Sequence, residues 1–231
     1  MRFFCKTVLA MAVLCCIQAT FPGPQTSDYA IHGIDVSHHQ NYINWDLVKN
    51  ENIFFVFMKA TEGRSFKDKR FNQNWAGAKR AGLRRGAYHF FSFHRTGKEQ
   101  VNNYIESVSL SPNDLPPVID LEYGSYSEKN RPKASVVVKE LRYMLEKFHQ
   151  HYGKRPILYC TYNCYNLYVK GIFDEYFVWI RDTKNSKPQL PNKQWLFWQY
   201  SAKGRISGIQ GNVDMNVFYG SPKTFYNFYN P

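Results

Sequence analysis

From residue 31 onward, segments with the composition of buried β-strands alternate with segments that have the apolar periodicity of helices. The run 53–59 (IFFVFMK) is almost continuously apolar, as expected for a strand that is buried on both faces. Thr96 and Glu99 form a capping box, and apolar side chains then recur at helical spacing as far as Val108. Alternation of strand and helix implies a parallel sheet whose strands are joined by helices.

The number of strands and helices narrows the choice of fold. We expect strands at 31–36, 53–59, 86–91, 117–122, 156–160, 176–180, 195–200 and 213–218. We expect helices around 45–48, 71–78, 101–108, 137–148 and 163–169. The late connecting segments contain prolines and glycines and lack helical periodicity. The sequence therefore predicts an α/β fold, a modified TIM-like barrel with eight strands and about five helices, in which the last helices are missing.

The length fits one such domain, because β/α barrels of roughly 200–250 residues form single units. We expect one barrel over residues 31–231, with the Tyr- and Phe-rich tail after Gly220 as a packed terminal extension. Residues 20–30 are expected to be a short linker.

The first 19 residues have the pattern of a signal peptide. Arg2 and Lys6 form a basic start, and the apolar run 8–17 that follows is too short for a comfortable membrane span. We expect cleavage near Ala19 and export to the periplasm, the extracellular space or a lipid-anchored position on the envelope. Lipidation at Cys15 or Cys16 and an uncleaved anchor are the alternatives that the sequence leaves open.

The net charge indicates the kind of partner that the protein binds, and the cysteines bear on disulfides and metal sites. The formal net charge is +12, and it suits an anionic partner such as nucleic acid or a bacterial envelope. The signal peptide and the scattered basic residues argue against nucleic acid. Outside the leader only Cys160 and Cys164 remain, and they are either a local disulfide or two free thiols. No second ligand pair accompanies them, so no metal site is implied.

Two carboxylates share one face of the fourth predicted strand. Side chains alternate across a strand, so Asp120 and Glu122 point one way while Ile119 and Leu121 point the other. With the apolar pair facing the helices, both acids face the barrel interior at the end of the strand where barrel enzymes place their chemistry. Two acids held close together suit glycoside cleavage, because one can keep a proton while the other stays ionised. A solvent-facing pair and a divalent metal site are the alternatives.

Two further acids are expected at the same rim. Asp35 ends the first predicted strand and Asp214 lies in the last, and these strands are neighbours in a closed barrel. Each alone is typical of a cap or a turn, but four acids together are hard to explain by packing. His38 and His39 resemble a metal pair only superficially, and no metal is expected there.

Aromatic and polar residues recur at the ends of the predicted strands. Aromatic residues make up 17% of the chain, and core packing is the ordinary explanation for most of them. A smaller set near the rim is expected to line a saccharide groove. This set contains Lys59, Tyr88, Tyr159, Trp198 and Tyr200.

Seven short motifs follow one another across nearly the whole chain after the leader. They are Gly33–Ser37 (GIDVS), Phe57–Gly63 (FMKATEG), Gly86–Phe90 (GAYHF), Pro117–Glu122 (PVIDLE), Pro156–Tyr159 (PILY), Phe197–Ser201 (FWQYS) and Val213–Phe218 (VDMNVF). Through them the chain resembles the family-25 glycoside hydrolases, the N-acetylmuramidase lysozymes of bacteria and phages. That family's fold is a barrel of eight strands with five helices, in agreement with the number predicted from the periodicity.

The resemblance implies an enzyme and assigns its residues. It implies a lysozyme that hydrolyses the β-1,4 bonds between N-acetylmuramic acid and N-acetylglucosamine in peptidoglycan, as a monomer and without metal or cofactor. Glu122 matches the general acid and Asp120 its carboxylate partner, while Asp35 and Asp214 match the other active-site acids. Lys59, Tyr88, Tyr159 and Trp198 match positions at the sugar cleft. A direct nucleophile, inversion and attack by the substrate's acetamido group all remain open, as do a chitinase-like enzyme and a non-catalytic wall-binding module.

Overall fold

The computed structural model describes residues 23–124, 129–191 and 195–229. The predicted signal peptide lies outside this part of the chain. In the part described, no helix combines the length and the apolar character needed to cross a membrane.

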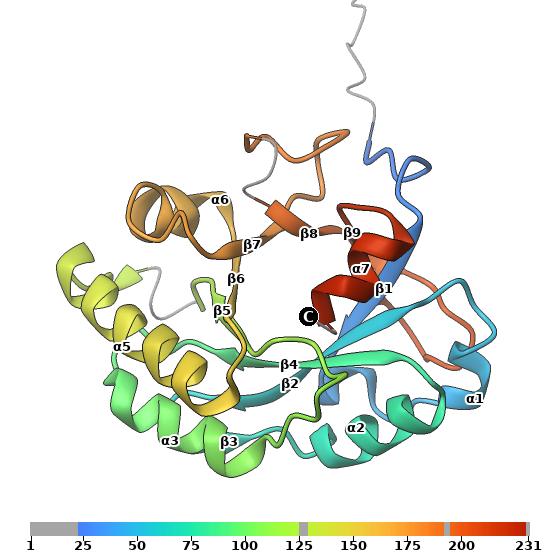
Figure 1. Cartoon of the computed structure of the whole chain (residues 1–231), viewed down its shortest axis with the longest axis horizontal. Helices are drawn as coiled ribbons and strands as arrows, with labels where there is room; N and C mark the ends of the chain where they lie inside the picture. Colours follow the sequence, from blue (N-terminus) through green and yellow to red (C-terminus); the bar gives the residue numbers. More distant parts are fainter. Residues whose placement is uncertain (1–22, 125–128, 192–194, 230–231) are drawn as a thin grey trace, which may run out of the picture.

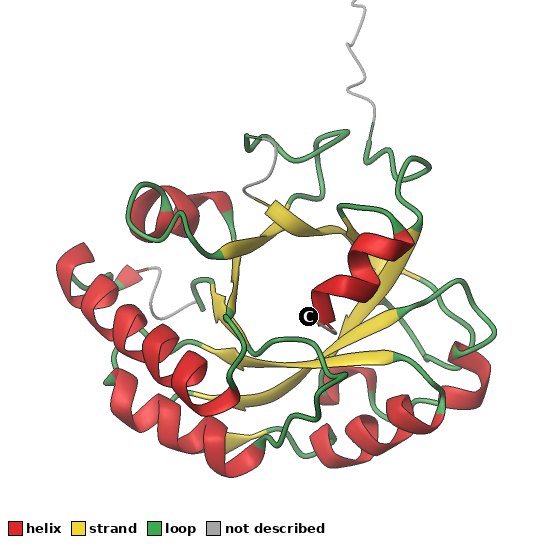
Figure 2. Ribbon diagram, viewed as in Figure 1, coloured by secondary structure: helices red, strands yellow, loops and turns green. Residues whose placement is uncertain are grey.

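Eight strands close into a barrel (Figures 1 and 2). They are β1 (Ile31–Val36), β2 (Phe55–Glu62), β4 (Arg84–Phe90), β5 (Val118–Leu121), β6 (Ile157–Cys160), β7 (Phe177–Arg181), β8 (Trp195–Gly204) and β9 (Val213–Phe218). Pairing of β1 with both β2 and β9 completes the closure. A short strand, β3 (Phe66–Lys67), forms a hairpin with the end of β2. The predicted eight-stranded α/β barrel is confirmed.

The last strand runs opposite to the others. Parallel pairing holds from β1 through β8, but β9 is antiparallel to both of its neighbours. Only eight residues, 205–212, separate β8 from β9, whereas a parallel crossover needs about a dozen or more. Gly208 and Gly211 in this connection have φ of +92° and +90°, values that favour glycine. The expectation of a fully parallel sheet is therefore wrong at this one strand.

The helices lie outside the barrel, mostly around the side formed by β2 to β7 (Figure 2). They are α1 (Trp45–Val48), α2 (Phe71–Arg80), α3 (Gly97–Ser107), α5 (Ala134–Tyr152) and α6 (Tyr162–Cys164), which continues as a π-helical turn, Tyr165–Val169, and there is a short 3-10 turn, His38–Gln40. The predicted Thr96–Glu99 capping box starts α3, and Gly153, at φ +65°, ends α5.

The chain end forms one more helix, α7 (Pro222–Tyr229), which closes the barrel at the end opposite the predicted acids (Figure 1). Phe225 and Tyr229, one helical turn apart, are buried. The Phe225 ring lies 5.7 Å from that of Phe55 and 5.0 Å from that of Phe218. The packed extension predicted after Gly220 is thus a helical plug.

Aromatic rings fill the barrel interior between the acids and α7, and glycines on the neighbouring strands leave room for them. Phe55 pairs in register with Gly33, and Phe57 pairs with Gly86. A Cβ at Gly86 would lie 2.4 Å from Cδ1 of the Phe57 ring, and a Cβ at Gly33 would lie equally close to the Phe55 ring. Phe57 in turn stacks on Trp179 with 4.6 Å between the ring centroids. The glycines therefore set the space that lets aromatic side chains form the floor beneath the acids.

Gly86→Ala is expected to lower the free energy of unfolding by about 1–3 kcal/mol, the usual cost of overpacking a core. The added methyl group meets the Phe57 ring, and that ring is confined by Trp179 and Phe197. Urea denaturation measures the change. Gly124→Ala is the control, because its added Cβ has nothing within 4 Å. Equal stability of the two variants would contradict this packing.

Candidate active site

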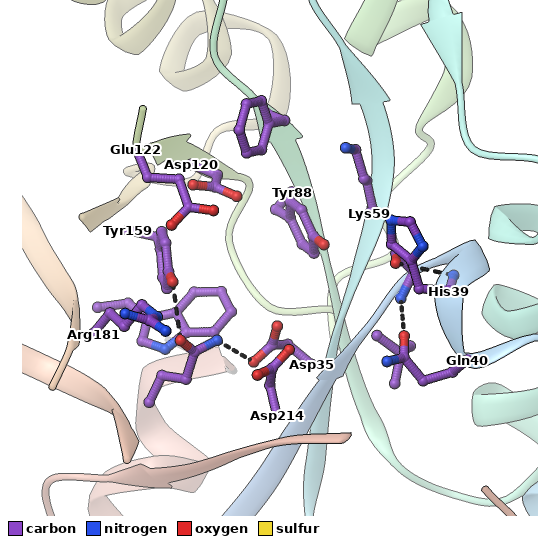
Figure 3. Close-up of a pocket in the computed structure, with 15 residues that line it drawn as sticks. Asp35, His39, Gln40, Lys59, Tyr88, Asp120, Glu122, Tyr159, Arg181 and Asp214 are labelled. Atoms are coloured by element: carbon purple, nitrogen blue, oxygen red, sulfur yellow. Dashed lines mark hydrogen bonds between the residues drawn. The ribbon is translucent and has the colours of Figure 1, made fainter. Parts of the chain in front are cut away.

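A cavity of about 350 Å³ opens at the rim where the parallel strands end (Figure 3). It is lined by Asp35, Val36, Ser37, His39, Gln40, Lys59, Tyr88, Phe90, Asp120, Glu122, Tyr159, Trp179, Arg181, Gln199 and Asp214. The structure thus brings all four predicted acids, which are far apart in the sequence, into one site. Its position agrees with the general placement of chemistry at the carboxyl ends of barrel strands.

The alternation of side chains along β5 aims two of these acids inward. Ile119 and Leu121 are fully buried in the layer between barrel and helices. Asp120 and Glu122 lie on the opposite side of the strand and line the cavity. Asp120 is only 7% exposed, and its Oδ1 atom has no hydrogen-bond partner among the residues that the structure describes. The sequence prediction of two inward carboxylates is therefore met, and one of them has an unsatisfied oxygen.

The other two acids meet because β9 is antiparallel. Asp35 and Asp214 are direct partners in the β1–β9 ladder. Asp214 lies near the beginning of its strand, and the reversed direction brings that beginning to the rim where Asp35 ends β1. A parallel β9 would have placed Asp214 toward the opposite end of the barrel.

A chain of hydrogen bonds fixes Asp35. Its Oδ2 accepts from Gln199 Nε2 at 2.9 Å and from Asn216 Nδ2 at 2.8 Å. Asn216 accepts from the Trp179 indole N–H at 2.8 Å, and Gln199 accepts from the Tyr159 hydroxyl at 3.0 Å. Because an indole N–H can only donate, the amide of Asn216 must turn its NH₂ group toward Asp35. Oδ2 is thus held as an acceptor, and only Oδ1 of this carboxyl is left to carry a proton.

Burial and mutual repulsion favour the protonated forms of these acids. Burial, followed by the charge of Asp214, raises the pKa of Asp35 well above its ordinary value. Burial, followed by the charge of Glu122, does the same to the pKa of Asp120, although Lys59 opposes it. The pKa of Glu122 and the pKa of Asp214 are also raised by burial, while Arg181 lowers both. The cavity therefore holds carboxyls that retain protons above the pH at which ordinary acids lose them.

These pKa shifts make the free energy of unfolding of the protein depend on pH. A carboxyl with a raised folded-state pKa stabilises the fold fully below its unfolded pKa, which is about 3.9 for Asp, and this contribution is lost as pH rises through the folded pKa. Asp120→Asn removes the buried ionisation. The free energy of unfolding of the variant, relative to the wild type, is expected to increase as pH rises from 4 to 8.

Urea denaturation across this range measures the effect. Asn72→Ala, at an exposed residue of α2 that has no ionisable group, is the control and is expected to show a difference from wild type that does not change with pH. A difference for Asp120→Asn that is flat over the same range would mean that the carboxyl ionises normally in the folded protein.

Three predicted sugar-binding residues lie in the cavity. Tyr88 and Tyr159 line it from β4 and β6, and burial beside the acids raises the pKa of each phenol well above its usual value. Lys59 lines it from β2, where its Nζ donates to Glu62 Oε2 at 2.6 Å. The Lys59 ammonium also lies 4.6 Å from the centroid of the Phe90 ring.

Trp198 and Tyr200, predicted as sugar-binding residues, do not line the cavity. Phe197 and Gln199 take the inward positions of β8, so the alternation turns Trp198 and Tyr200 outward. Trp198 is fully buried in the outer layer, and its indole N–H donates to the Asp182 carbonyl at 2.7 Å. The tryptophan that lines the cavity is Trp179 on β7.

Sequence reasoning missed Arg181 as well. It is the last residue of β7, the position where barrel strands deliver functional side chains, and the sequence FVWIR ends a strand-like run with a charge. That signal was available and was not used.

Metal-binding geometry is absent from the described residues, in which no three His, Cys, Asp or Glu side chains are grouped to hold an ion. His38 Nδ1 lies 2.7 Å from Asp68 Oδ2, and its ring packs against His39 with 4.1 Å between centroids. Cys160 and Cys164 are buried free thiols, which settles the choice between a disulfide and two thiols.

Comparisons with known proteins agree with this fold. The model of the glycosyl hydrolases family 25 matches residues 34–209. A solved family 25 glycosyl hydrolase from Bacillus anthracis is 41% identical, with a TM-score of 0.85 over 89% of this chain and 96% of that one. The bacterial lysozyme of Streptomyces coelicolor is 31% identical, with a TM-score of 0.79 over 87% and 97%.

Two similar sequences complete the comparison. The uncharacterised protein YegX of Escherichia coli is 35% identical over 87% of this chain and 74% of its own length. Lysozyme M1 of Streptomyces globisporus is 34% identical over 83% and 68%. With a family model that spans most of its barrel and relatives above 30% identity, this chain belongs to the glycosyl hydrolases of family 25.

Proposed function

We propose that the protein is a lysozyme, an N-acetylmuramidase that hydrolyses the β-1,4 bonds between N-acetylmuramic acid and N-acetylglucosamine in peptidoglycan. The observation that carries the proposal is the convergence of Asp35, Asp120, Glu122 and Asp214 on one cavity at the barrel rim. The similarity to the lysozymes of Streptomyces globisporus and Streptomyces coelicolor supports the choice of substrate.

In this proposal Glu122 is the general acid. It is the more accessible member of the β5 pair, and burial raises its pKa, so it can hold a proton at the working pH and give it to the leaving oxygen. The charge of Arg181 favours the ionised form of the same carboxyl, which eases release of its proton to the leaving oxygen in the first step.

Asp120 fits the role of partner to the substrate's acetamido group. Its buried Oδ1 lacks a hydrogen-bond partner, and an unsatisfied buried oxygen is costly. When Glu122 is protonated and Asp120 is ionised, the acetamido N–H of the sugar would donate a hydrogen bond to this Oδ1 atom. The acetamido oxygen would then attack the anomeric carbon as the glycosidic bond breaks and Glu122 protonates the leaving oxygen. Water completes the hydrolysis, with Glu122 accepting its proton.

The remaining acids complete the polar surface around the reacting carbon. The Gln199 and Asn216 amides hold Asp35 in one orientation, and Asp214 lies beside it in the adjoining strand. We assign to these two acids the stabilisation of positive charge as it develops at the anomeric centre.

The experiment is a digestion of purified peptidoglycan by the purified protein, followed by borohydride reduction of the new reducing ends. Muramicitol is the expected product. Glucosaminitol alone would instead identify a glucosaminidase, and release of ends from chitin but not from peptidoglycan would identify a chitinase. Binding to walls without new ends would identify a non-catalytic wall-binding module.

We also propose that the protein is exported, on the basis of the leader pattern in residues 1–19. Without Arg2 and Lys6 the remaining chain carries a formal charge of 12 − 2 = +10, which suits the anionic polymers of a bacterial envelope. The mass and N-terminal sequence of the protein recovered from cell fractions test this, and a full-length chain confined to the cytoplasm would refute it.

A further inference from the structure

Arg181 is the cation of the cavity whose donors are unused. It ends β7, is exposed, and lines the cavity on the side across from Lys59 (Figure 3). Within residues 23–124, 129–191 and 195–229, no hydrogen bond and no ion pair shorter than 4 Å joins its guanidinium to another group. Lys59, in contrast, is already paired with Glu62 at 2.6 Å.

The carboxylate nearest to Arg181 in sequence is engaged elsewhere. Asp182 accepts from the Tyr162 hydroxyl at 2.7 Å and from the side chain and backbone of Asn185 at 2.8 and 3.0 Å. These bonds hold its pKa below the ordinary value despite partial burial. Asp182 therefore shapes the turn after β7 and does not pair with Arg181, which lines the cavity and whose charge acts there on Glu122 and Asp214.

The cavity can accept an anion beside Arg181 despite its four acids. Burial raises the pKa of each of them, so part of the formal negative charge is neutralised by protons. A guanidinium presents a planar fork of donors that matches a carboxylate in a bidentate arrangement. An unpaired Arg on the wall of an otherwise acidic site is thus suited to a carboxylate carried by the ligand.

We propose that Arg181 binds the free lactyl carboxylate of N-acetylmuramic acid residues that carry no stem peptide, and so favours peptide-free muramic-acid strands over chitin. This inference rests on the proposed function. N-acetylmuramic acid differs from N-acetylglucosamine only by the lactyl ether, so a residue that recognises its free carboxylate distinguishes a peptide-free muramic-acid strand from chitin. Arg181 is then a specificity-determining residue, separate from the acids that act on the glycosidic bond.

The test compares two forms of one glycan. Strands freed of their stem peptides carry lactyl carboxylates, and methyl esterification of the same strands removes the charge while keeping the sugars. Dissociation constants are measured in a Glu122→Gln background so that no strand is cleaved. Arg181→Gln is expected to weaken binding of the carboxylate strands about 10- to 150-fold, the usual effect of losing charge-assisted hydrogen bonds, and to leave binding of the ester strands nearly unchanged. Arg181→Lys keeps the charge but not the planar fork of donors. Its dissociation constant for the carboxylate strands is expected to lie between those of the Arg181 and Arg181→Gln proteins.

The controls separate this role from a general one. Arg155→Gln removes an equal charge from an exposed residue just before β6, at the opposite end of the barrel, and is expected to alter neither constant. Equal weakening of both strands by Arg181→Gln, or no weakening of either, would overturn the inference. Failure of the proposed function would appear separately, as a wild-type digest without muramicitol, and the two dissociation constants would still be compared.

Discussion

Glu122→Gln is expected to lower kcat on peptidoglycan by about 10²–10⁴-fold, the range that a general acid–base group supplies. Glutamine has nearly the same shape but cannot donate the proton that the leaving oxygen needs. Because Glu122 is a carboxyl whose burial disfavours the charged form, its neutral replacement should leave the fold at least as stable as the wild type at neutral pH.

The measurement is the rate of appearance of reducing ends at saturating substrate, together with urea denaturation of the same preparations. Glu106→Gln is the matched control, since that glutamate lies on α3 and its side chain is 67% exposed beside Lys67. A Glu122→Gln enzyme that keeps more than a tenth of the wild-type kcat would remove Glu122 from the role of general acid.

Asp114→Ala is expected to lower the free energy of unfolding by about 3–5 kcal/mol, the cost of leaving a buried charge without its partner. Asp114 Oδ1 accepts from Arg85 Nε at 2.7 Å, and its Oδ2 accepts from Arg85 Nη2 at 3.2 Å. Both side chains are 7% exposed. Arg85 also donates to the Trp75 carbonyl at 2.9 Å and lies over the Trp75 ring, so the guanidinium cannot turn to solvent without giving up the anchor between β4 and α2.

Two comparisons test the reason for this loss. The double variant Arg85→Met/Asp114→Leu is expected to recover most of the stability, because an apolar pair has no charge to desolvate. Asp46→Ala breaks the exposed Lys49–Asp46 pair and is expected to cost less than about 1 kcal/mol. If Asp114→Ala cost no more than Asp46→Ala, the buried pair would contribute nothing beyond a surface contact.

The sequence predicted the barrel well because its signals are local. The apolar run that forms most of β2 and the Thr96–Glu99 capping box that starts α3 each act within a few residues, and the structure has both. The inward placement of Asp120 and Glu122 followed from the period of two along one strand, given apolar neighbours that had to face the helices.

The same period of two misled at β8. Aromatic residues occur on both faces of that strand, so composition alone did not indicate which face points to the barrel interior. The structure places Phe197 and Gln199 inside and Trp198 outside, because Phe197 fits among the Phe55, Phe57 and Phe218 rings of the barrel floor. Packing between strands that are distant in sequence made this decision.

By itself, the sequence determined the order of the strands, the face on which the β5 acids lie and the family motifs, since all three are encoded in short stretches. Only the tertiary structure decided that β9 reverses, that Asp35 and Asp214 therefore meet, and that Arg181 lines the cavity with no hydrogen bond to the rest of the described chain. These features depend on the closure of the barrel. Closure is set by contacts between residues that are far apart in the sequence, and no local sequence pattern encodes those contacts.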